Sequence, residues 1–228
     1  MATDTAYGLV RAFDDFNRKA IDTTNYYTSN TDSGGTAFAI NEQRNGVVRG
    51  SVDTTDNDIT NLFKDGPIYR PNAGGPVIME SRVTLITSVA DGETYVGFSD
   101  DDGTDEVAIT LSAADVQTSN ATDAAGFAYT GAGTADWKRV GANNGSITNA
   151  ARCNVKGATT PVAATWQTLK VVINEDGDAD YYIDGIFQGT IASATRATIS
   201  LNPAWALQGG GTARSVDVDY IYVQAGRI

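Results

Sequence analysis

Two acidic clusters have the composition of a cation site. They read Asp100-Asp101-Asp102-Gly103-Thr104-Asp105-Glu106 and Asp176-Gly177-Asp178-Ala179-Asp180, and calcium needs several converging oxygen ligands. The candidate ligands are Asp100, Asp102, Asp176, Asp178 and Asp180. Neither cluster fits the EF-hand loop, because counting from Asp176 gives Tyr181 rather than Gly at position 6. Asp and Gly are also common hairpin residues, so we expect solvated turns without a cofactor, with calcium as the alternative.

The residues that are missing exclude several kinds of catalysis. The chain contains no histidine and a single cysteine, Cys153. Without histidine there is no Ser-His-Asp triad and no His-ligated zinc. One cysteine excludes an intrachain disulfide and a cysteine-cluster zinc site, and we expect Cys153 to be a buried, inert thiol. Catalysis by carboxylates alone stays open.

Aromatic residues provide a second kind of candidate, for stacking on sugar rings. They are the three tryptophans, Trp137, Trp166 and Trp205, and the pair Tyr26-Tyr27. Sandwich cores also use such side chains for bulk. Trp166 opens an alternating segment, so we expect it in the core. Trp205 follows Asn202-Pro203 in a loop-like setting and is the better candidate for glycan contact.

A small basic cluster lies near the N-terminus of an otherwise acidic chain. The interpretations that imply no function are a solvated chain end and a strand of a sheet. Its functional interpretation is an arm over residues 1–35 that pairs with carboxylates on a shell or on a neighbouring subunit. The expected anchor residues are Arg11, Phe13, Phe16, Arg18 and Lys19.

Length and charge restrict the class of protein further. The chain has 228 residues, 41% of them apolar, which suits one large β domain with its own core. The net charge of −12 repels the phosphate backbone, so we expect no nucleic-acid partner. No apolar run approaches the roughly 18 residues of a membrane span. The first residues show no signal peptide, so we expect no membrane partner and synthesis in the cytosol.

The segment from Trp166 to Ile191 indicates two successive hairpins. Leu169, Val171 and Ile173 sit two residues apart and share one face of a strand. A turn follows, and alternation resumes at Tyr181. Asp184-Gly185 is a type I′ signal, because both central positions of that turn need positive φ.

The remainder from residue 36 also alternates between short strands and turns. We expect about twelve short strands and no long helix. The expectations include a loop over Thr54–Asn61, a strand over Arg196–Leu201 and a closing strand over Ser215–Val223. In the closing strand, Val216, Val218, Tyr220 and Tyr222 are expected to face one way, and Asp217 and Asp219 the other. The predicted fold is all-β: an antiparallel β-sandwich or jelly roll over residues 36–228, preceded by an extended N-terminal arm.

The order of these segments resembles the concanavalin A-like (laminin-G-like) jelly roll. The resemblance spans most of residues 36–224 and implies that the last strand pairs beside the first. That fold hosts lectins, glycanases, adhesion modules and virion proteins. The matching segments are Glu80-Ser-Arg-Val-Thr-Leu, Tyr95-Val-Gly-Phe-Ser-Asp, Gly126-Phe-Ala-Tyr, Trp166-Gln-Thr-Leu-Lys-Val, Tyr182-Ile-Asp-Gly and Val218-Asp-Tyr-Ile-Tyr-Val.

Glycoside hydrolases of this fold carry the strand motif Glu-x-Asp-x-Glu, which places two carboxylates on one face. The corresponding strand here reads Glu80-Ser81-Arg82-Val83-Thr84, with a single acid. We therefore expect Glu80 to form an ion pair, and we expect a protein that is not an enzyme.

A narrower resemblance concerns structural proteins of tailed bacteriophages. It rests on Phe13-Asp14-Asp15-Phe16, the jelly roll, and the strand with Asp219-Tyr-Ile that ends near Arg227. It implies a capsid decoration or cement protein on the virion surface. Its partners would be the major capsid protein and copies of itself, as a trimer or, second, a dimer. The alternative is a carbohydrate-binding (lectin-like) module for glycan adhesion.

Overall fold

The computed structural model describes residues 9–32, 34–41, 46–64, 68–86, 89–101, 107–114, 116–147, 151–152 and 159–226. These residues form 18 strands and no helix. Among them, no helix is long and apolar enough to cross a membrane. The all-β prediction is confirmed.

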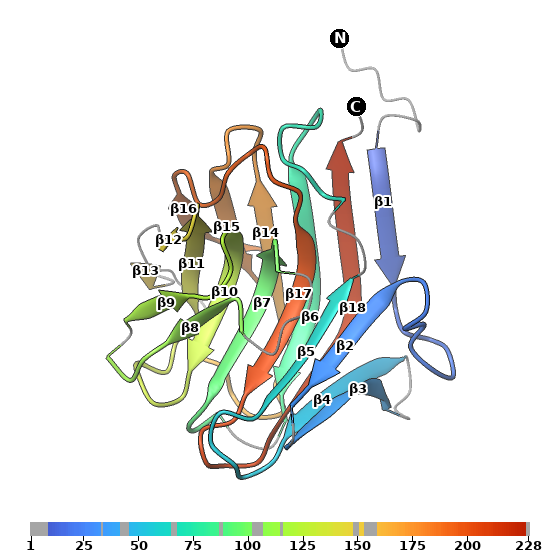
Figure 1. Ribbon diagram of the computed structural model, residues 1–228, viewed down its shortest axis with the longest axis vertical. Coiled ribbons are helices and arrows are strands. Elements are labelled where there is room, and N and C mark those ends of the chain that lie inside the picture. Colours follow the sequence, from blue (N-terminus) through green and yellow to red (C-terminus); the bar gives the residue numbers. More distant parts are fainter. Residues whose placement is uncertain are drawn as a thin grey trace.

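Two antiparallel sheets of eight strands each lie face to face (Figure 1). Sheet A consists of β16 (Ile186–Ile191), β15 (Ala179–Ile183), β14 (Gln167–Ile173), β6 (Val77–Leu85), β18 (Arg214–Gly226), β4 (Val47–Val52) and β3 (Gly35–Asn41), with β1 (Leu9–Asp14) also paired to β18. Sheet B consists of β12 (Ser146–Ile147), β11 (Lys138–Asn143), β10 (Ala124–Thr130), β7 (Glu93–Ser99), β17 (Asn202–Gln208), β5 (Ile59–Lys64) and β2 (Tyr27–Thr31), with β13 (Ala151–Arg152) paired to β11. A separate ribbon joins β8 (Ile109–Leu111) and β9 (Gln117–Ser119).

The predicted double hairpin is confirmed in β14, β15 and β16. Leu169, Val171 and Ile173 are all buried, as their period of two requires. Asp184 and Gly185 have φ values of 51° and 77°, the left-handed pair that a type I′ turn demands.

The main core fills the space between the two sheets. Strands from both sheets send alternate side chains inward, and aromatic rings supply much of the bulk. The largest of these buried side chains are Phe16, Tyr27, Tyr69, Phe98, Phe127, Tyr129, Trp137, Tyr181 and Trp205.

A second apolar cluster lies on the outer face of sheet B, beneath the β8–β9 ribbon (Figure 1). On β10, Ala125 and Phe127 belong to the main core, whereas Ala124 and Ala128 belong to this cluster. Small side chains on the sheet allow the ribbon to approach closely. The ribbon therefore covers part of that face with its own chain.

The N-terminal segment contributes strands to both sheets. Leu9–Asp14 pairs with the C-terminal end of β18, from Ile221 to Gly226, and Tyr27–Thr31 pairs with β5. The sheet-strand interpretation therefore holds for residues 9–14. The sandwich begins before residue 36, so the expected boundary between arm and domain does not coincide with a structural division.

Three sequence expectations about strands were wrong. The strand expected at Arg196–Leu201 lies instead at Asn202–Gln208, where Pro203 is tolerated because pairing with β5 starts only at Ala204. The expected loop Thr54–Asn61 includes the start of β5. In β18 a bulge between Val218 and Tyr220 reverses the alternation. Val218 therefore faces the core, whereas Tyr220 and Tyr222 face outward.

Candidate functional site

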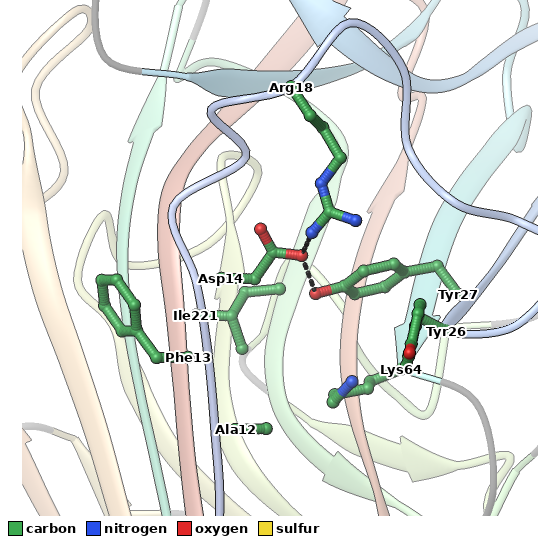
Figure 2. Close-up of a pocket in the computed structure, with 8 residues that line it drawn as sticks. All are labelled: Ala12, Phe13, Asp14, Arg18, Tyr26, Tyr27, Lys64 and Ile221. Carbon is green, nitrogen blue, oxygen red and sulfur yellow. Dashed lines mark hydrogen bonds and ion pairs between the residues drawn. The ribbon is translucent and has the colours of Figure 1, made fainter.

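A pocket of about 230 Å³ opens at the edge of the sandwich, where β1 of sheet A faces β2 and β5 of sheet B (Figure 2). Ala12, Phe13 and Asp14 of β1 form one wall, and Lys64 of β5 contributes to the other. The pocket exists because β1 pairs with β18 and β2 pairs with β5. These two pairings bring together residues that are far apart in the sequence.

Asp14 is the polar centre of the pocket. Its Oδ2 accepts a hydrogen bond of 2.8 Å from the hydroxyl of Tyr27 and forms an ion pair with Arg18 (Figure 2). Its Oδ1 accepts a bond of 2.8 Å from the backbone N–H of Phe16. Burial raises the pKa of Tyr27 well above its usual value, so the hydroxyl stays protonated and donates. The carboxylate is thereby fixed in one orientation.

Two tyrosine rings and one ammonium group form the opposite side. Nζ of Lys64 lies 5.4 Å from the ring centre of Tyr26 and 5.1 Å from that of Tyr27, within the range of a cation–π interaction. Tyr27 is buried, but Tyr26 is 53% exposed. An open aromatic face thus adjoins charged groups.

The turn before β2 positions Tyr26. Asp22 accepts hydrogen bonds from the backbone N–H groups of Thr24 and Asn25, and its carbonyl accepts from Tyr26 and Tyr27. The side chain of Asn25 also donates to Asp22 and lowers the pKa of that carboxyl. This Asx-type turn holds Tyr26 at the pocket mouth.

The five expected anchor residues separate into three groups. Phe13 and Arg18 line the pocket. Arg11 and Lys19 are exposed and do not line it, although Arg11 donates to the side chain of Gln224 at 3.2 Å. Phe16 was wrongly predicted as a contact residue. It has a left-handed φ of 52°, is fully buried, and packs its ring 5.9 Å from that of Tyr27.

The tryptophan predictions need two corrections. Trp205 is fully buried in the middle of β17, and its Nε1 donates to Ser81 at 3.1 Å, so it cannot contact a glycan in the folded protein. Trp166 was expected in the core. It is only half-buried, with the guanidinium of Arg82 4.9 Å from its ring centre. Trp137 is buried and donates to Gln167.

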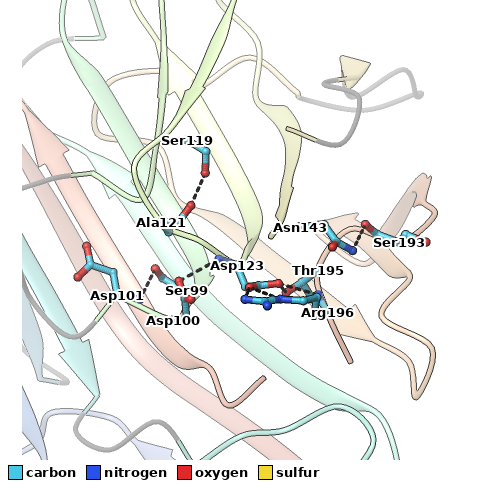
Figure 3. A network of polar contacts seen from close by, with 10 residues as sticks. All are labelled: Ser99, Asp100, Asp101, Ser119, Ala121, Asp123, Asn143, Ser193, Thr195 and Arg196. Atoms are coloured by element: carbon cyan, nitrogen blue, oxygen red, sulfur yellow. Dashed lines mark hydrogen bonds and ion pairs between the residues drawn. The ribbon is translucent and has the colours of Figure 1, made fainter. Parts of the chain in front are cut away.

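The calcium candidates take part in turns and loop contacts. Asp100 accepts a bond of 2.9 Å from the backbone N–H of Asp123, and Asp123 pairs with Arg196 (Figure 3). Burial raises the pKa of Asp100. Asp178 accepts from the backbone of Ser193, and Asp180 from Thr190. Asp176 is exposed in the β14–β15 turn.

In the described part of the chain, no group of three or more acidic, cysteine or histidine residues is arranged to hold a metal ion. Asp102, together with Cys153 and Arg227, lies outside the described residues.

Glu80 lies on the outer face of sheet A. Arg82 and Thr84 occupy the positions two and four residues later, where the hydrolase motif has its other acidic residues. Its Oε1 accepts a bond of 2.8 Å from the hydroxyl of Tyr220, and its Oε2 lies 4.0 Å from Nζ of Lys170 on the next strand. The expected ion pair is present, with Lys170 rather than Arg82 as the cation. Arg82 pairs with Asp219 at 2.8 Å.

Comparison with known proteins bears on the fold. No protein-family model and no curated protein sequence matches the chain. The carbohydrate recognition domain of Emp47p is 12% identical, with 98% of this chain and 99% of that chain covered and a TM-score of 0.62. A glycoside hydrolase family 16 endo-glucanase from Bacteroides ovatus is 13% identical. The match covers 93% of this chain and 99% of that chain, with a TM-score of 0.65.

A structure from work on endo-acting O-glycanases of the human gut microbiota, which initiate mucin breakdown, is 10% identical. It covers 93% of this chain and 97% of that chain, with a TM-score of 0.66. The fold is a concanavalin A-like jelly roll. The resemblance inferred from the sequence is therefore confirmed for the fold, and these low identities establish nothing beyond the jelly roll itself.

The sequence does not single out the two other charged residues of the pocket, Asp14 and Lys64. Asp14 occurs only within the Phe13-Asp14-Asp15-Phe16 element, and Lys64 belongs to no motif. Lys64 meets the tyrosines because β5 pairs with β2 in the register Tyr27 with Lys64. That register depends on pairing between strands that are distant in the sequence, so no local sequence pattern predicts it.

Proposed function

We propose that this jelly roll is a glycan-binding module that holds a sugar in the pocket between β1, β2 and β5. The observation that carries the proposal is the exposed ring of Tyr26 beside a carboxylate, a guanidinium and an ammonium group in one small cavity. The carbohydrate-recognising and glycan-cleaving structures of the same fold support it.

Each group in the pocket has a role that suits a sugar. The Tyr26 face can cover the apolar C–H face of a pyranose ring, as aromatic side chains do for flat apolar surfaces. Asp14 is an acceptor of fixed orientation. Arginine carries five N–H donors, so Arg18 can hold Asp14 and still donate to a ligand hydroxyl. Donors and acceptors side by side match adjacent hydroxyl groups.

The pocket supports binding without hydrolysis. Glycoside hydrolysis uses two carboxyl groups about 5–9.5 Å apart on opposite sides of the scissile bond. The residues that line this pocket include one carboxylate, Asp14, and it is held by Arg18 and Tyr27. We therefore propose a protein that is not an enzyme. A location on a virion stays a prediction from the sequence resemblance alone.

The pocket is tested by calorimetric titration of the full chain with soluble oligosaccharides, from mucin O-glycans in one series and from β-glucan in the other. We expect Tyr26→Ala to weaken binding of the preferred series about tenfold, or about 1.4 kcal/mol, because the stacking face is lost. Tyr26→Phe should bind nearly as well as the unchanged protein.

The matched control is Ile68→Ala, which removes another exposed apolar side chain, 61% accessible and not among the residues that line the pocket. Circular dichroism establishes that each variant is folded. Absence of binding to both series, or equal affinities of Tyr26→Ala and Ile68→Ala, would contradict the proposal.

A further inference from the structure

One row of six side chains, each the lateral neighbour of the next, crosses the outer face of sheet A. The strand register pairs Phe13 with Tyr222, Tyr222 with Glu80, Glu80 with Lys170, Lys170 with Tyr182, and Tyr182 with Phe187. Each member comes from a different strand, from β1 at one edge to β16 at the other. With neighbouring strands about 4.8 Å apart, the row spans about 24 Å.

The two ends of this row are aromatic and open to solvent. Phe13 is 65% exposed, and its ring centre lies 6.0 Å from that of Tyr220. Phe187 is 47% exposed, and its ring centre lies 5.4 Å from that of Tyr182. Exposed large apolar side chains that line up on one face indicate a contact surface more strongly than the same side chains scattered singly.

Hydrogen-bonding groups occupy the middle of the row. Glu80 accepts from Tyr220, and Tyr222 donates to Gln224 at 2.6 Å. Burial, aided by the bond to Glu80, raises the pKa of Tyr220 to about 12, so this hydroxyl remains a donor. The face therefore combines aromatic rings with fixed polar groups.

The charges on this face cancel. Lys170 lies opposite Glu80, Arg82 pairs with Asp219, and Arg49 binds Asp217 through two hydrogen bonds of 2.6 and 2.8 Å. The whole chain nevertheless carries a net charge of −12. A second copy or a nucleic acid brings negative charge toward this protein, whereas an uncharged polymer meets no such repulsion.

We infer that the outer face of sheet A binds an extended, uncharged polysaccharide that lies across the strands. The inference concerns a surface that shares Phe13 with the pocket and extends from there across the sheet to β16. With the proposed function it shares the class of ligand. The aromatic pairs at the two ends cover sugar rings, and the central polar groups bond to hydroxyls between them. The length of the row requires a chain of several sugars, so a short oligosaccharide covers only part of it.

The inference is tested by electrophoresis of the full chain through native gels that contain barley β-glucan or galactomannan, both uncharged, or polygalacturonate, which is charged. We expect retardation by at least one uncharged polymer, unaffected by 0.5 M NaCl, and none by polygalacturonate. The double variant Tyr182→Ala/Phe187→Ala should weaken the apparent affinity at least tenfold. The control Ile68→Ala/Val162→Ala removes two exposed apolar side chains from elsewhere and should change nothing.

Tyr26→Ala separates this inference from the proposed function. We expect this variant to keep its retardation by the polymer while its oligosaccharide binding weakens about tenfold. Three results overturn the inference: no retardation by either uncharged polymer, equal retardation of the double variant and the unchanged protein, or a dimer in gel filtration that the double variant converts to a monomer. In the last case the face joins two copies. Oligosaccharide binding without polymer retardation would leave the pocket proposal standing alone.

Discussion

Replacing Trp205 by alanine is expected to lower the free energy of unfolding by about 3–5 kcal/mol, the usual cost of removing a buried large aromatic side chain. Trp205 is fully buried in β17, and its Nε1 donates to Ser81 on the opposite sheet. The variant would lose packing between the sheets and one hydrogen bond together. Urea unfolding followed by circular dichroism measures the change.

The comparison variant is Trp166→Ala, which removes a half-buried ring and its contact with Arg82. We expect it to cost about 1 kcal/mol, mainly through the lost cation–π contact. Trp205→Phe should keep most of the packing, so its loss in the free energy of unfolding should lie between those of Trp166→Ala and Trp205→Ala. A folded Trp205→Ala protein of nearly unchanged stability would show that this side chain is not central to the core.

The contribution of Glu93 to the free energy of unfolding is expected to fall by about 3 kcal/mol as the pH rises from about 4.5 to 7. Burial raises the pKa of Glu93 from 4.5 to about 7, partly offset by a hydrogen bond from the backbone of Leu111 and the charge of Arg214. Within the described residues, its Oε2 accepts no hydrogen bond. Burial also lowers the pKa of Arg214 to about 10. Desolvation therefore outweighs the attraction between these two groups.

The sign follows from proton linkage. The folded protein holds the Glu93 proton more tightly than the unfolded chain, so the stabilisation is complete below the unfolded pKa and is lost as the pH rises through the folded pKa. Each unit of pKa difference is worth about 1.4 kcal/mol. Urea unfolding at several pH values should show the fall in the unchanged protein and a flatter profile in Glu93→Gln.

Glu175→Gln, at an exposed turn position, is the matched control and should keep the full pH dependence. The pKa of Asp58 and that of Asp100 are also raised by burial. The difference between the Glu93 variant and the unchanged protein therefore isolates Glu93. Identical profiles for Glu93→Gln and the unchanged protein would refute this assignment.

Local patterns predicted the fold well where the turn chemistry is explicit. Asp184-Gly185 and the alternation of Leu169, Val171 and Ile173 predicted two hairpins that the structure contains. The same reasoning failed at Pro203, because its tolerance in a strand depends on where β5 begins to pair. It failed at the β18 bulge for a similar reason, since one extra residue reverses every later side chain.

The candidate site was less predictable than the fold. The sequence singled out Phe13, Arg18 and Tyr26 for their chemistry, and all three line one pocket. It could not supply Lys64, whose position depends on a register between distant strands. It also could not separate exposed from buried aromatics, which is why Trp205 was expected outside and Trp166 inside. Exposure depends on the second sheet, and no single segment specifies it.

The β8–β9 ribbon has a consequence for how this protein meets other molecules. Its contacts with β7, β10 and β11 fill the alanine-rich side of sheet B. A molecule that approaches from that side meets the ribbon, in which Val116 and Thr118 are exposed, instead of the pleated surface of sheet B. The two surfaces proposed for glycan binding, the outer face of sheet A and the pocket beside β1, do not include the ribbon. A tag or an immobilising linker attached to the ribbon should therefore leave both surfaces accessible.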